Sequence, residues 1–127
     1  KIKLNPIKDI IKDKSVVIID DSIVRGTTCQ RMIAMIRENG ARKVHVRIAS
    51  PPVRFPCYYG IDTPTREELA AAKMNIDRLA EQVGADSLAF LTEEDLVSAI
   101  GQGARKNCTA CFSGDYMEGD QQDDMEL

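Results

Sequence analysis

The sequence predicts an α/β fold built on a doubly wound parallel sheet, and three short segments carry that prediction. Residues 15–20 (SVVIID) form a continuous apolar run that ends in charge, which is typical of a strand buried on both faces of a parallel sheet. Residues 43–50 (KVHVRIAS) alternate between apolar and polar side chains, and residues 87–91 (SLAFL) predict a third short strand. The first two segments are linked by short joints and a helix, so they predict a right-handed βαβ unit.

Capping residues and apolar periodicity predict four helices around these strands. Their ranges are 27–40, 65–74, 75–84 and 92–101. Thr27 or Thr28 is the expected N-cap of the first helix, which Gly40 ends. Thr65 and Glu68 have the spacing of a capping box at the start of the second helix.

Composition narrows the classes of function. A chain of 127 residues with 43% hydrophobic residues suits a single domain with a packed core. A net charge of −3 and a pI of about 5.2 argue against a nucleic acid or a membrane surface as partner, because both need a basic patch. The sequence has no signal peptide and starts with Lys1 rather than Met, so we expect a cytoplasmic protein and a piece of a longer chain or a processed product.

Two adjacent aspartates, Asp20 and Asp21, follow the first apolar run, where like charges repel unless a cation or a hydroxyl-bearing ligand meets them. Ligands of parallel sheets bind at the carboxyl ends of the strands. Carboxylates accept hydrogen bonds from the vicinal hydroxyls of a ribose, and they are ligands for Mg²⁺. Residues 22–28 (SIVRGTT) then lead into a helix N-terminus, whose backbone N–H groups and dipole favour an anion. The stretch therefore predicts a sugar-phosphate clamp.

A plain joint between strand and helix is the alternative for this stretch, because Gly-Thr-Thr is common where helices begin. The paired acids at the end of an apolar strand favour the clamp. Neither the P-loop pattern nor G-x-G-x-x-G is present, which argues against a nucleoside triphosphate or a dinucleotide as ligand.

The segment VVIIDDSIVRGTT (16–28) resembles the phosphoribosylpyrophosphate (PRPP) motif of type I phosphoribosyltransferases, and its DDSIVRGTT part resembles glutamine PRPP amidotransferases in particular. Other segments resemble that family in the same order along the chain. They are residues 3–14, 49–62, 64–71, 84–96 and 107–116. The resemblance implies a type I phosphoribosyltransferase-like sheet, present in part, with C-terminal helices and a cysteine-bearing loop.

The resemblance also implies roles for the clamp residues. Asp20 and Asp21 would engage the ribose of PRPP and Mg²⁺. The loop around the 5′-phosphate would consist of Ser22, Ile23, Val24, Arg25, Gly26, Thr27 and Thr28. In the family, ammonia released from glutamine displaces pyrophosphate at C1 of the ribose to give phosphoribosylamine, which opens purine synthesis. We expect no catalytic residue in this chain, because that step needs positioning and charge stabilisation rather than side-chain chemistry.

The family's N-terminal glutaminase domain, with its terminal cysteine nucleophile, has no counterpart in this sequence, and neither does the first part of the transferase domain. We therefore expect residues 1–114 to be the C-terminal part of a phosphoribosyltransferase domain, inactive alone, and the acidic residues 115–127 to be a disordered tail. The expected partners are PRPP, purine nucleotides as feedback ligands, the glutaminase domain and further copies of the same chain.

Cys108 and Cys111 form a C-x-x-C pair in the expected loop of residues 102–114, a spacing that suits half a zinc site, a redox pair or two iron–sulfur ligands. The resemblance implies that Cys57, Cys108 and Cys111 bind a [4Fe–4S] cluster whose fourth ligand lies upstream of this sequence. Cys29 is expected to be a small buried residue in a first helical turn. His45 is expected to be a strand residue with a structural hydrogen bond.

Two other functions stay open on the sequence alone. One is a base-salvage phosphoribosyltransferase, and the other is a non-catalytic nucleotide-sensing module that keeps the clamp without the chemistry. The three cysteines and the segment SPPVRFPCYYGID (50–62) argue against a salvage enzyme, which has no use for them. The sequence upstream of Lys1 would separate the amidotransferase from the sensing module.

Overall fold

Three parallel strands form one sheet in the order β1-β2-β3 in the computed structural model, which describes residues 8–101 and 107–117. The strands are β1 (Ser15–Asp20), β2 (Lys43–Ile48) and β3 (Ser87–Phe90). Asp20 lies opposite Ile48, and Ile48 lies opposite Phe90, so all three strands end at one edge of the sheet. The parallel α/β class and the three strand positions predicted from the sequence are confirmed.

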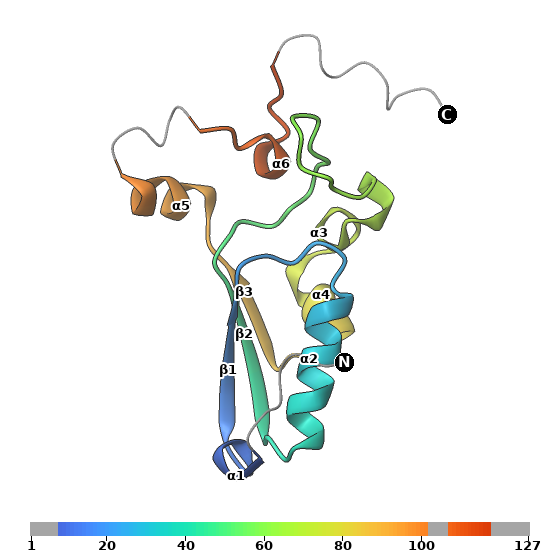
Figure 1. Ribbon diagram of the computed structural model, residues 1–127, viewed down its shortest axis with the longest axis vertical. Coiled ribbons are helices and arrows are strands. Elements are labelled where there is room, and N and C mark those ends of the chain that lie inside the picture. Colours follow the sequence, from blue (N-terminus) through green and yellow to red (C-terminus); the bar gives the residue numbers. More distant parts are fainter. Residues whose placement is uncertain (1–7, 102–106, 118–127) are drawn as a thin grey trace.

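Helices α2 (Thr27–Glu38) and α4 (Ile76–Val83) pack on the same face of this sheet (Figure 1). Helix α2 has Cys29, Ile33 and Ile36 on one side, at the spacing that faces a helix toward a core. Ile33 of α2 and Leu79 of α4 are at most 1% exposed. Full burial of an aliphatic side chain of this size stabilises the fold by roughly 1.5–3 kcal/mol. The N-terminus of α2 is therefore held firmly beside the carboxyl ends of the strands.

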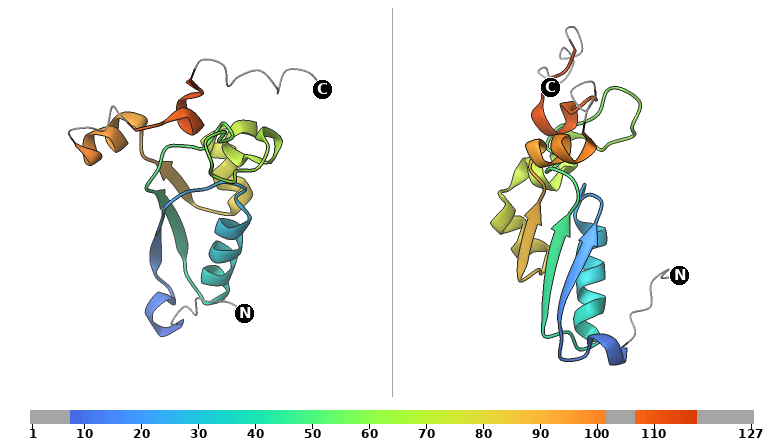
Figure 2. Two further views of the ribbon diagram at one scale, coloured as in Figure 1. Left: turned by 45° about the horizontal axis from the view of Figure 1, so that its top comes forward. Right: turned by 90° about the vertical axis from the view of Figure 1, so that its left-hand side faces the viewer.

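The other face of the sheet is not covered by α2 or α4 (Figure 2). Val17 and Ile19 of β1 are 57% and 77% exposed there, while Ile18 between them is 8% exposed. The expectation that residues 15–20 are buried on both faces is therefore wrong for the described part of the chain. An apolar run predicts a strand whose side chains favour burial. It does not predict which other element covers the second face of the sheet.

His45 lies on this uncovered face and links all three strands. Its Nδ1 lies 2.8 Å from Ser87 Oγ, and its Nε2 lies 3.2 Å from Ser15 Oγ. Arg47 adds a bond from its guanidinium to Ser87 Oγ at 3.0 Å. The expected structural role of His45 is confirmed, because the imidazole joins β1, β2 and β3 through side-chain hydrogen bonds.

The helix expected over 65–74 is broken into two short pieces, η1 (Arg66–Glu68) and α3 (Ala70–Lys73). Between them Leu69 has an extended backbone (φ −74°, ψ 115°) and a fully buried side chain. The capping box does not form, since Glu68 pairs with Arg25 instead. Burial of Leu69 and the contact with Arg25 are tertiary interactions, and they outweigh the local preference for a continuous helix.

The remaining helices begin and end near their predicted positions. Asn75 caps α4 by accepting from Arg78 N at 2.9 Å. Helix α5 (Glu93–Ile100) has a complete capping box between Thr92 and Asp95. Helix α6 (Ala110–Ser113) lies in the segment 102–114 that is expected to be a loop, and helix α1 (Lys8–Ile11) precedes β1. Residues 118–127, most of the expected tail, lie outside the described residues.

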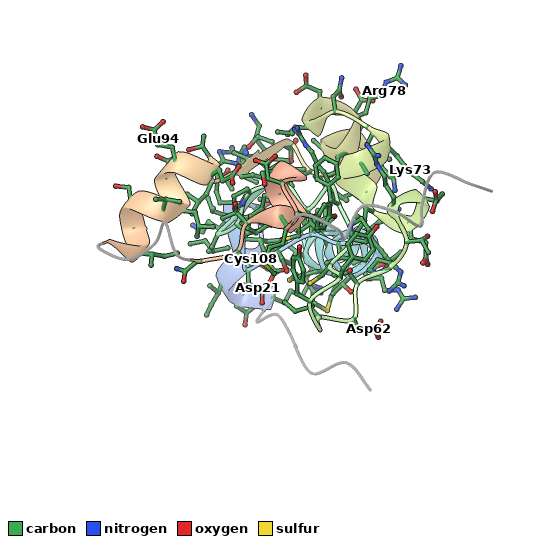
Figure 3. All side chains as sticks on the ribbon, turned by 90° about the horizontal axis from the view of Figure 1, so that it is seen from above. Asp21, Asp62, Lys73, Arg78, Glu94 and Cys108 are labelled. Carbon is green, nitrogen blue, oxygen red and sulfur yellow. The ribbon has the colours of Figure 1, made fainter. Side chains whose placement is uncertain are left out.

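Charged side chains lie at the periphery of the fold. Figure 3 shows Glu94 projecting outward from α5, on the opposite side of the molecule from Lys73 and Arg78. Within the described ranges, no helix has both the length and the apolar character needed to cross a membrane.

Asp86 ties the end of α4 to α2 and β2 just before β3 begins. Its Oδ2 accepts from the backbone N–H of Val44 at 2.7 Å and from the Arg37 guanidinium at 2.8 Å. Arg37 also donates to the carbonyl of Gly84 at 2.8 Å. The Val44 hydrogen bond, followed by that of Arg37, lowers the pKa of Asp86 below its usual value. The carboxylate is thus favoured by the fold in its charged form.

We expect the free energy of unfolding to depend less steeply on pH in the acid range for Asp86→Asn than for the wild type. Because the pKa of Asp86 is lower in the folded chain, its stabilising contribution is complete above the pKa of an unfolded aspartate and is lost as the pH falls through the folded value. Urea unfolding at a series of pH values from 7 to below about 4 measures this. Equal pH slopes for the wild type and the variant would contradict the assignment.

Candidate active site

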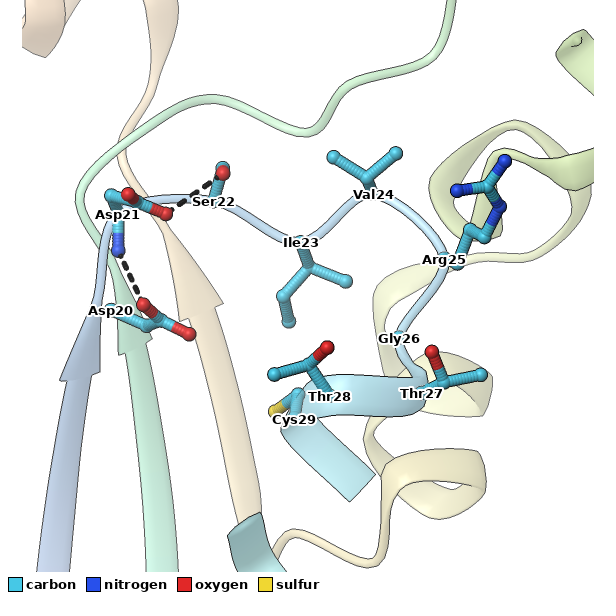
Figure 4. Close-up of a pocket in the computed structure, with 10 residues that line it drawn as sticks. All are labelled: Asp20, Asp21, Ser22, Ile23, Val24, Arg25, Gly26, Thr27, Thr28 and Cys29. Carbon is cyan, nitrogen blue, oxygen red and sulfur yellow. Dashed lines mark hydrogen bonds between the residues drawn. The ribbon is translucent and has the colours of Figure 1, made fainter. Parts of the chain in front are cut away.

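Ten consecutive residues at the carboxyl end of β1 line one pocket of about 320 Å³ (Figure 4). Nine of them are the residues that the sequence assigns to the clamp. The ten are Asp20, Asp21, Ser22, Ile23, Val24, Arg25, Gly26, Thr27, Thr28 and Cys29. The chain turns from β1 into α2 around this space, so the two carboxylates face the same opening as the helix N-terminus.

The pocket loop is held in shape by one buried side chain and one glycine. Ile23 is 3% exposed and anchors the middle of the loop in the core. Gly26 has φ +82°, a left-handed conformation that side chains with a Cβ adopt only at a cost, and its carbonyl accepts the bond from Gln30 N that starts α2. The buried Ile23 and the left-handed backbone of Gly26 thus define the path of the loop into α2.

The acidic pair is oriented by short-range hydrogen bonds. The backbone N–H of Asp21 donates to Asp20 Oδ1 at 3.0 Å, and Ser22 Oγ donates to Asp21 Oδ1 at 2.9 Å (Figure 4). Among the described residues, neither carboxylate has an ion-pair partner. Two negative charges at one pocket wall are thus available to a cation or to hydroxyl groups. One or two carboxylates together with ligand phosphates are a usual environment for Mg²⁺, so these residues suit that ion.

The N-terminus of α2 forms the opposite wall and has no side-chain cap. The expected capping by Thr27 or Thr28 is wrong, because Gly26 takes the N-cap position and both threonines belong to the first turn. The N–H groups of that turn have no partner within the helix, and an anion suits them. The hydroxyls of Thr27 and Thr28 are not used for capping and lie at the loop end of the helix (Figure 4).

Cys29 closes the pocket from below and is 3% exposed. Burial, with a smaller contribution from the negative charge of Asp20, raises the pKa of its thiol to about 11. The thiol is therefore protonated at neutral pH and is a poor nucleophile. The expectation of a small buried residue is confirmed, and the helix N-terminus does not make this cysteine reactive.

The two segments that carry the other cysteines pack against each other beyond the pocket. The backbone N–H groups of Arg54 and Phe55 both donate to the carbonyl of Cys111, at 3.0 and 3.2 Å. Tyr116 donates through its hydroxyl to the carbonyl of Pro56 at 2.7 Å. Figure 1 shows α6 beside the loop that follows β2. Segments 54–59 and 107–117 thus form one junction although they are far apart in the sequence.

At this junction the thiol of Cys111 has a pKa that departs from its ordinary value. Burial is the main cause that raises the pKa of Cys111, and the charges of Cys57 and Cys108 raise it further. The described residues nevertheless contain no group of three His, Cys, Asp or Glu side chains that could hold a metal ion. A single zinc ion needs all its ligand atoms within about 2.0–2.3 Å of one point. The junction thus brings the three cysteines to one region, without a preformed site for one ion.

One residue of the site has no signal in the sequence. Glu68 contacts Arg25 of the pocket loop across 43 positions of chain, with Nε and Oε1 3.2 Å apart. The sequence pattern assigns Glu68 to a capping box instead. A Glu in the pattern Thr-x-x-Glu can bond the backbone at the start of its own helix, or it can pair with a residue far away in the sequence such as Arg25. The pattern alone does not distinguish these two contacts.

Comparison with known proteins gives consistent results. No family model matches the chain. The chain is 54% identical over 93% of its length to an amidophosphoribosyltransferase of Pyrococcus horikoshii, of which it covers 26%. It is 49% identical over 91% of its length to the chloroplastic amidophosphoribosyltransferase 2 of Arabidopsis thaliana, of which it covers 21%.

Solved structures show the same relationship. The glutamine PRPP amidotransferase of B. subtilis, in complex with ADP and GMP, matches 91% of this chain with a TM-score of 0.83 and 46% identity. The match covers 26% of that chain. The present chain spans about a quarter of the length of the proteins it matches. It is therefore related, in sequence and in its phosphoribosyltransferase-like fold, to one segment of the amidophosphoribosyltransferases.

Proposed function

We propose that the chain is the part of an amidophosphoribosyltransferase that binds PRPP and Mg²⁺. The observation that carries this proposal is the pocket in which the pair Asp20 and Asp21 faces the uncapped N-terminus of α2. A ribose with a 5′-phosphate presents two vicinal hydroxyls at one end and a dianion at the other. The carboxylates suit the hydroxyls, and the N–H groups of the loop and helix suit the phosphate.

The proposed reaction replaces the pyrophosphate at C1 of PRPP with ammonia from glutamine and gives 5-phosphoribosylamine, the first step of de novo purine biosynthesis. In it, Asp20 and Asp21 hold the ribose, and the loop with Thr27 and Thr28 fixes the 5′-phosphate. Mg²⁺, when bound, supplies positive charge that stabilises the pyrophosphate as it leaves. Fixing both ends of the sugar orients C1 toward the incoming ammonia, which is the main contribution of this chain.

Two requirements of this reaction lie beyond these residues. Ammonia release needs a glutaminase site, which we place in a separate N-terminal domain of the intact protein. Residues 1–114 would then be the C-terminal part of the transferase domain. The chain covers 21–26% of these relatives, which supports its being a part of a longer protein. Purine nucleotides are the proposed feedback ligands, since the similar B. subtilis structure contains ADP and GMP.

Titration calorimetry with PRPP and Mg²⁺ on the intact protein tests the proposal directly. We expect binding that depends on Mg²⁺ and glutamine-dependent formation of phosphoribosylamine. PRPP binding without any turnover would favour the nucleotide-sensing module over the enzyme. Turnover with a purine base in place of ammonia would favour a salvage phosphoribosyltransferase.

A [4Fe–4S] cluster at the junction of segments 54–59 and 107–117 is the second element of the proposal. The backbone hydrogen bonds from Arg54 and Phe55 to Cys111 support this proposal, because they join the segment that carries Cys57 to the segment that carries Cys108 and Cys111. Each of these thiolates would bind a different iron of the cluster, so their sulfurs need not surround one point. The fourth thiolate would come from upstream of Lys1. A bound cluster would fasten the two segments together, because its binding free energy adds to that of the folded state.

We expect the intact protein, purified without oxygen, to be brown and to contain about four irons per chain. Cys108→Ser removes one thiolate and should abolish the colour and most of the iron. Cys29→Ala is the matched control, since this thiol lies in the pocket and should leave the iron content unchanged. Stoichiometric zinc with a colourless protein would show that the site is a zinc site instead.

A further inference from the structure

The guanidinium of Arg25, in the pocket loop, is bound by a residue that lies outside that loop. Arg25 is the one basic residue among the ten that line the pocket. Its Nε donates to Glu68 Oε1 at 3.2 Å, and the two side chains are 54% and 49% exposed. Bonding through Nε leaves the two terminal nitrogens of the guanidinium outside this pair. Arg25 thus lines the pocket while Glu68 engages only one of its three guanidinium nitrogens.

A second attachment lies beside the first. The backbone N–H of Ala70 donates to the carbonyl of Val24 at 2.9 Å. Val24 and Arg25 are thus both bound by the segment 68–70. Leu69 between the two contacts is fully buried, which fixes the segment to the core. The extended backbone at Leu69 breaks the helix, and this break puts Glu68 and Ala70 in position to reach the loop.

Two sets of carboxylates, the pair Asp20 and Asp21 on one side and Glu68 on the other, could attract the side chain of Arg25. The pocket wall formed by Asp20 and Asp21 carries two carboxylates, which attract a guanidinium. Arg25 forms an ion pair with neither of them, and Figure 4 shows its side chain at the far end of the loop, beside the 66–73 segment. The carboxylate of Glu68 stabilises this position, in which Arg25 makes no ion pair with Asp20 or Asp21.

From these contacts we propose that Glu68 is a positioning residue, which holds Arg25 at the phosphate end of the pocket and away from the acidic pair. The proposal rests on the proposed function, because it assigns the phosphate end of the same site. Glu68 acts through Arg25 and touches no part of the ligand.

A double-mutant cycle on the intact protein tests this, with PRPP and Mg²⁺ binding measured by calorimetry. Glu68→Ala should weaken binding by roughly 1.5- to 5-fold, the size of one exposed ion pair. Glu68→Asp should restore part of the loss. In the Arg25→Ala background, Glu68→Ala should have no further effect on affinity, because its route of action is gone.

Salt dependence and a matched control complete the test. The difference in PRPP affinity between the wild type and Glu68→Ala should shrink as ionic strength rises, because salt screens the exposed ion pair. Glu94→Ala removes the same charge from a residue of α5 that does not line the pocket, and it should leave affinity unchanged. Urea unfolding should show that all variants are folded, so that a change in affinity is not a loss of structure.

Two results would overturn the positioning role. One is tighter binding by Glu68→Ala, which would mean that Glu68 competes with the ligand for Arg25. The other is an equal effect of Glu68→Ala with and without Arg25. Absence of PRPP binding by the wild type would instead refute the proposed function, so the two failures are distinguishable.

Discussion

Replacing either carboxylate of the acidic pair, as Asp20→Asn or Asp21→Asn, is expected to weaken binding of PRPP with Mg²⁺ by roughly 10- to 150-fold, which corresponds to about 1.5–3 kcal/mol for one charged hydrogen bond. The amide keeps the shape of the side chain but loses the charge that a cation or a hydroxyl pair needs. Because both side chains are polar and neither is buried, folding should be little affected. Calorimetry on the intact protein measures the affinity.

The Mg²⁺ dependence separates the two roles of the pair. Loss of a metal ligand should raise the Mg²⁺ concentration needed for half-maximal binding, whereas loss of a ribose contact should lower PRPP affinity even at saturating Mg²⁺. Asp62→Asn is a suitable control, because Figure 3 shows Asp62 at the periphery and it does not line the pocket. Unchanged PRPP affinity in both Asp20→Asn and Asp21→Asn would refute the clamp.

Gly114→Ala is expected to loosen the junction between segments 54–59 and 107–117. Gly114 has φ +82°, and a Cβ there would lie 2.9 Å from the ring of Phe55. The left-handed backbone alone costs about 1–2 kcal/mol for a residue with a Cβ. Forcing an atom against a packed ring costs a further 1–3 kcal/mol, roughly. Hydrogen exchange at the N–H groups of Arg54 and Phe55, which donate to Cys111, should therefore accelerate.

Gly84→Ala is the matched control for this prediction. Gly84 has φ +82° at the end of α4, but a Cβ there would make only an ordinary contact, 3.8 Å from Ile33. Gly84→Ala should therefore destabilise the fold only through its left-handed backbone, without a steric clash. Hydrogen exchange at the N–H groups of Arg54 and Phe55 should not change. Phe55→Leu combined with Gly114→Ala removes the ring and should recover part of the protection. Equal exchange in Gly114→Ala and the wild type would show that the ring moves aside freely.

Local signals were sufficient for most of the secondary structure. The strand at 15–20 and the helices expected over 75–84 and 92–101 each depend on residues close in sequence, and all are present in the fold. The juxtaposition of Asp20 and Asp21 with a helix N-terminus was also predictable, because strand, loop and helix are consecutive and parallel sheets place their ligands at that edge.

Distant contacts account for what the sequence could not reveal. The break at Leu69 depends on a core position and on Arg25, neither of which is visible in the pattern of residues 65–74. The exposure of Ile19 depends on what covers the second face of the sheet. The packing of Cys111 against segment 54–59 could be expected only through the family resemblance, because the backbone hydrogen bonds that hold it are encoded by no side-chain motif.

Strand β1 pairs with one neighbour only in the described sheet, and its uncovered face carries Val17 and Ile19. Such an edge is a template onto which another extended chain adds readily, and natural sheets protect it with charge, proline or a covering element. We therefore expect aggregation of the isolated chain to begin at this strand. A lysine at position 19 would place a gatekeeper charge at the aggregation-prone edge while leaving the pocket, on the loop beyond it, chemically intact.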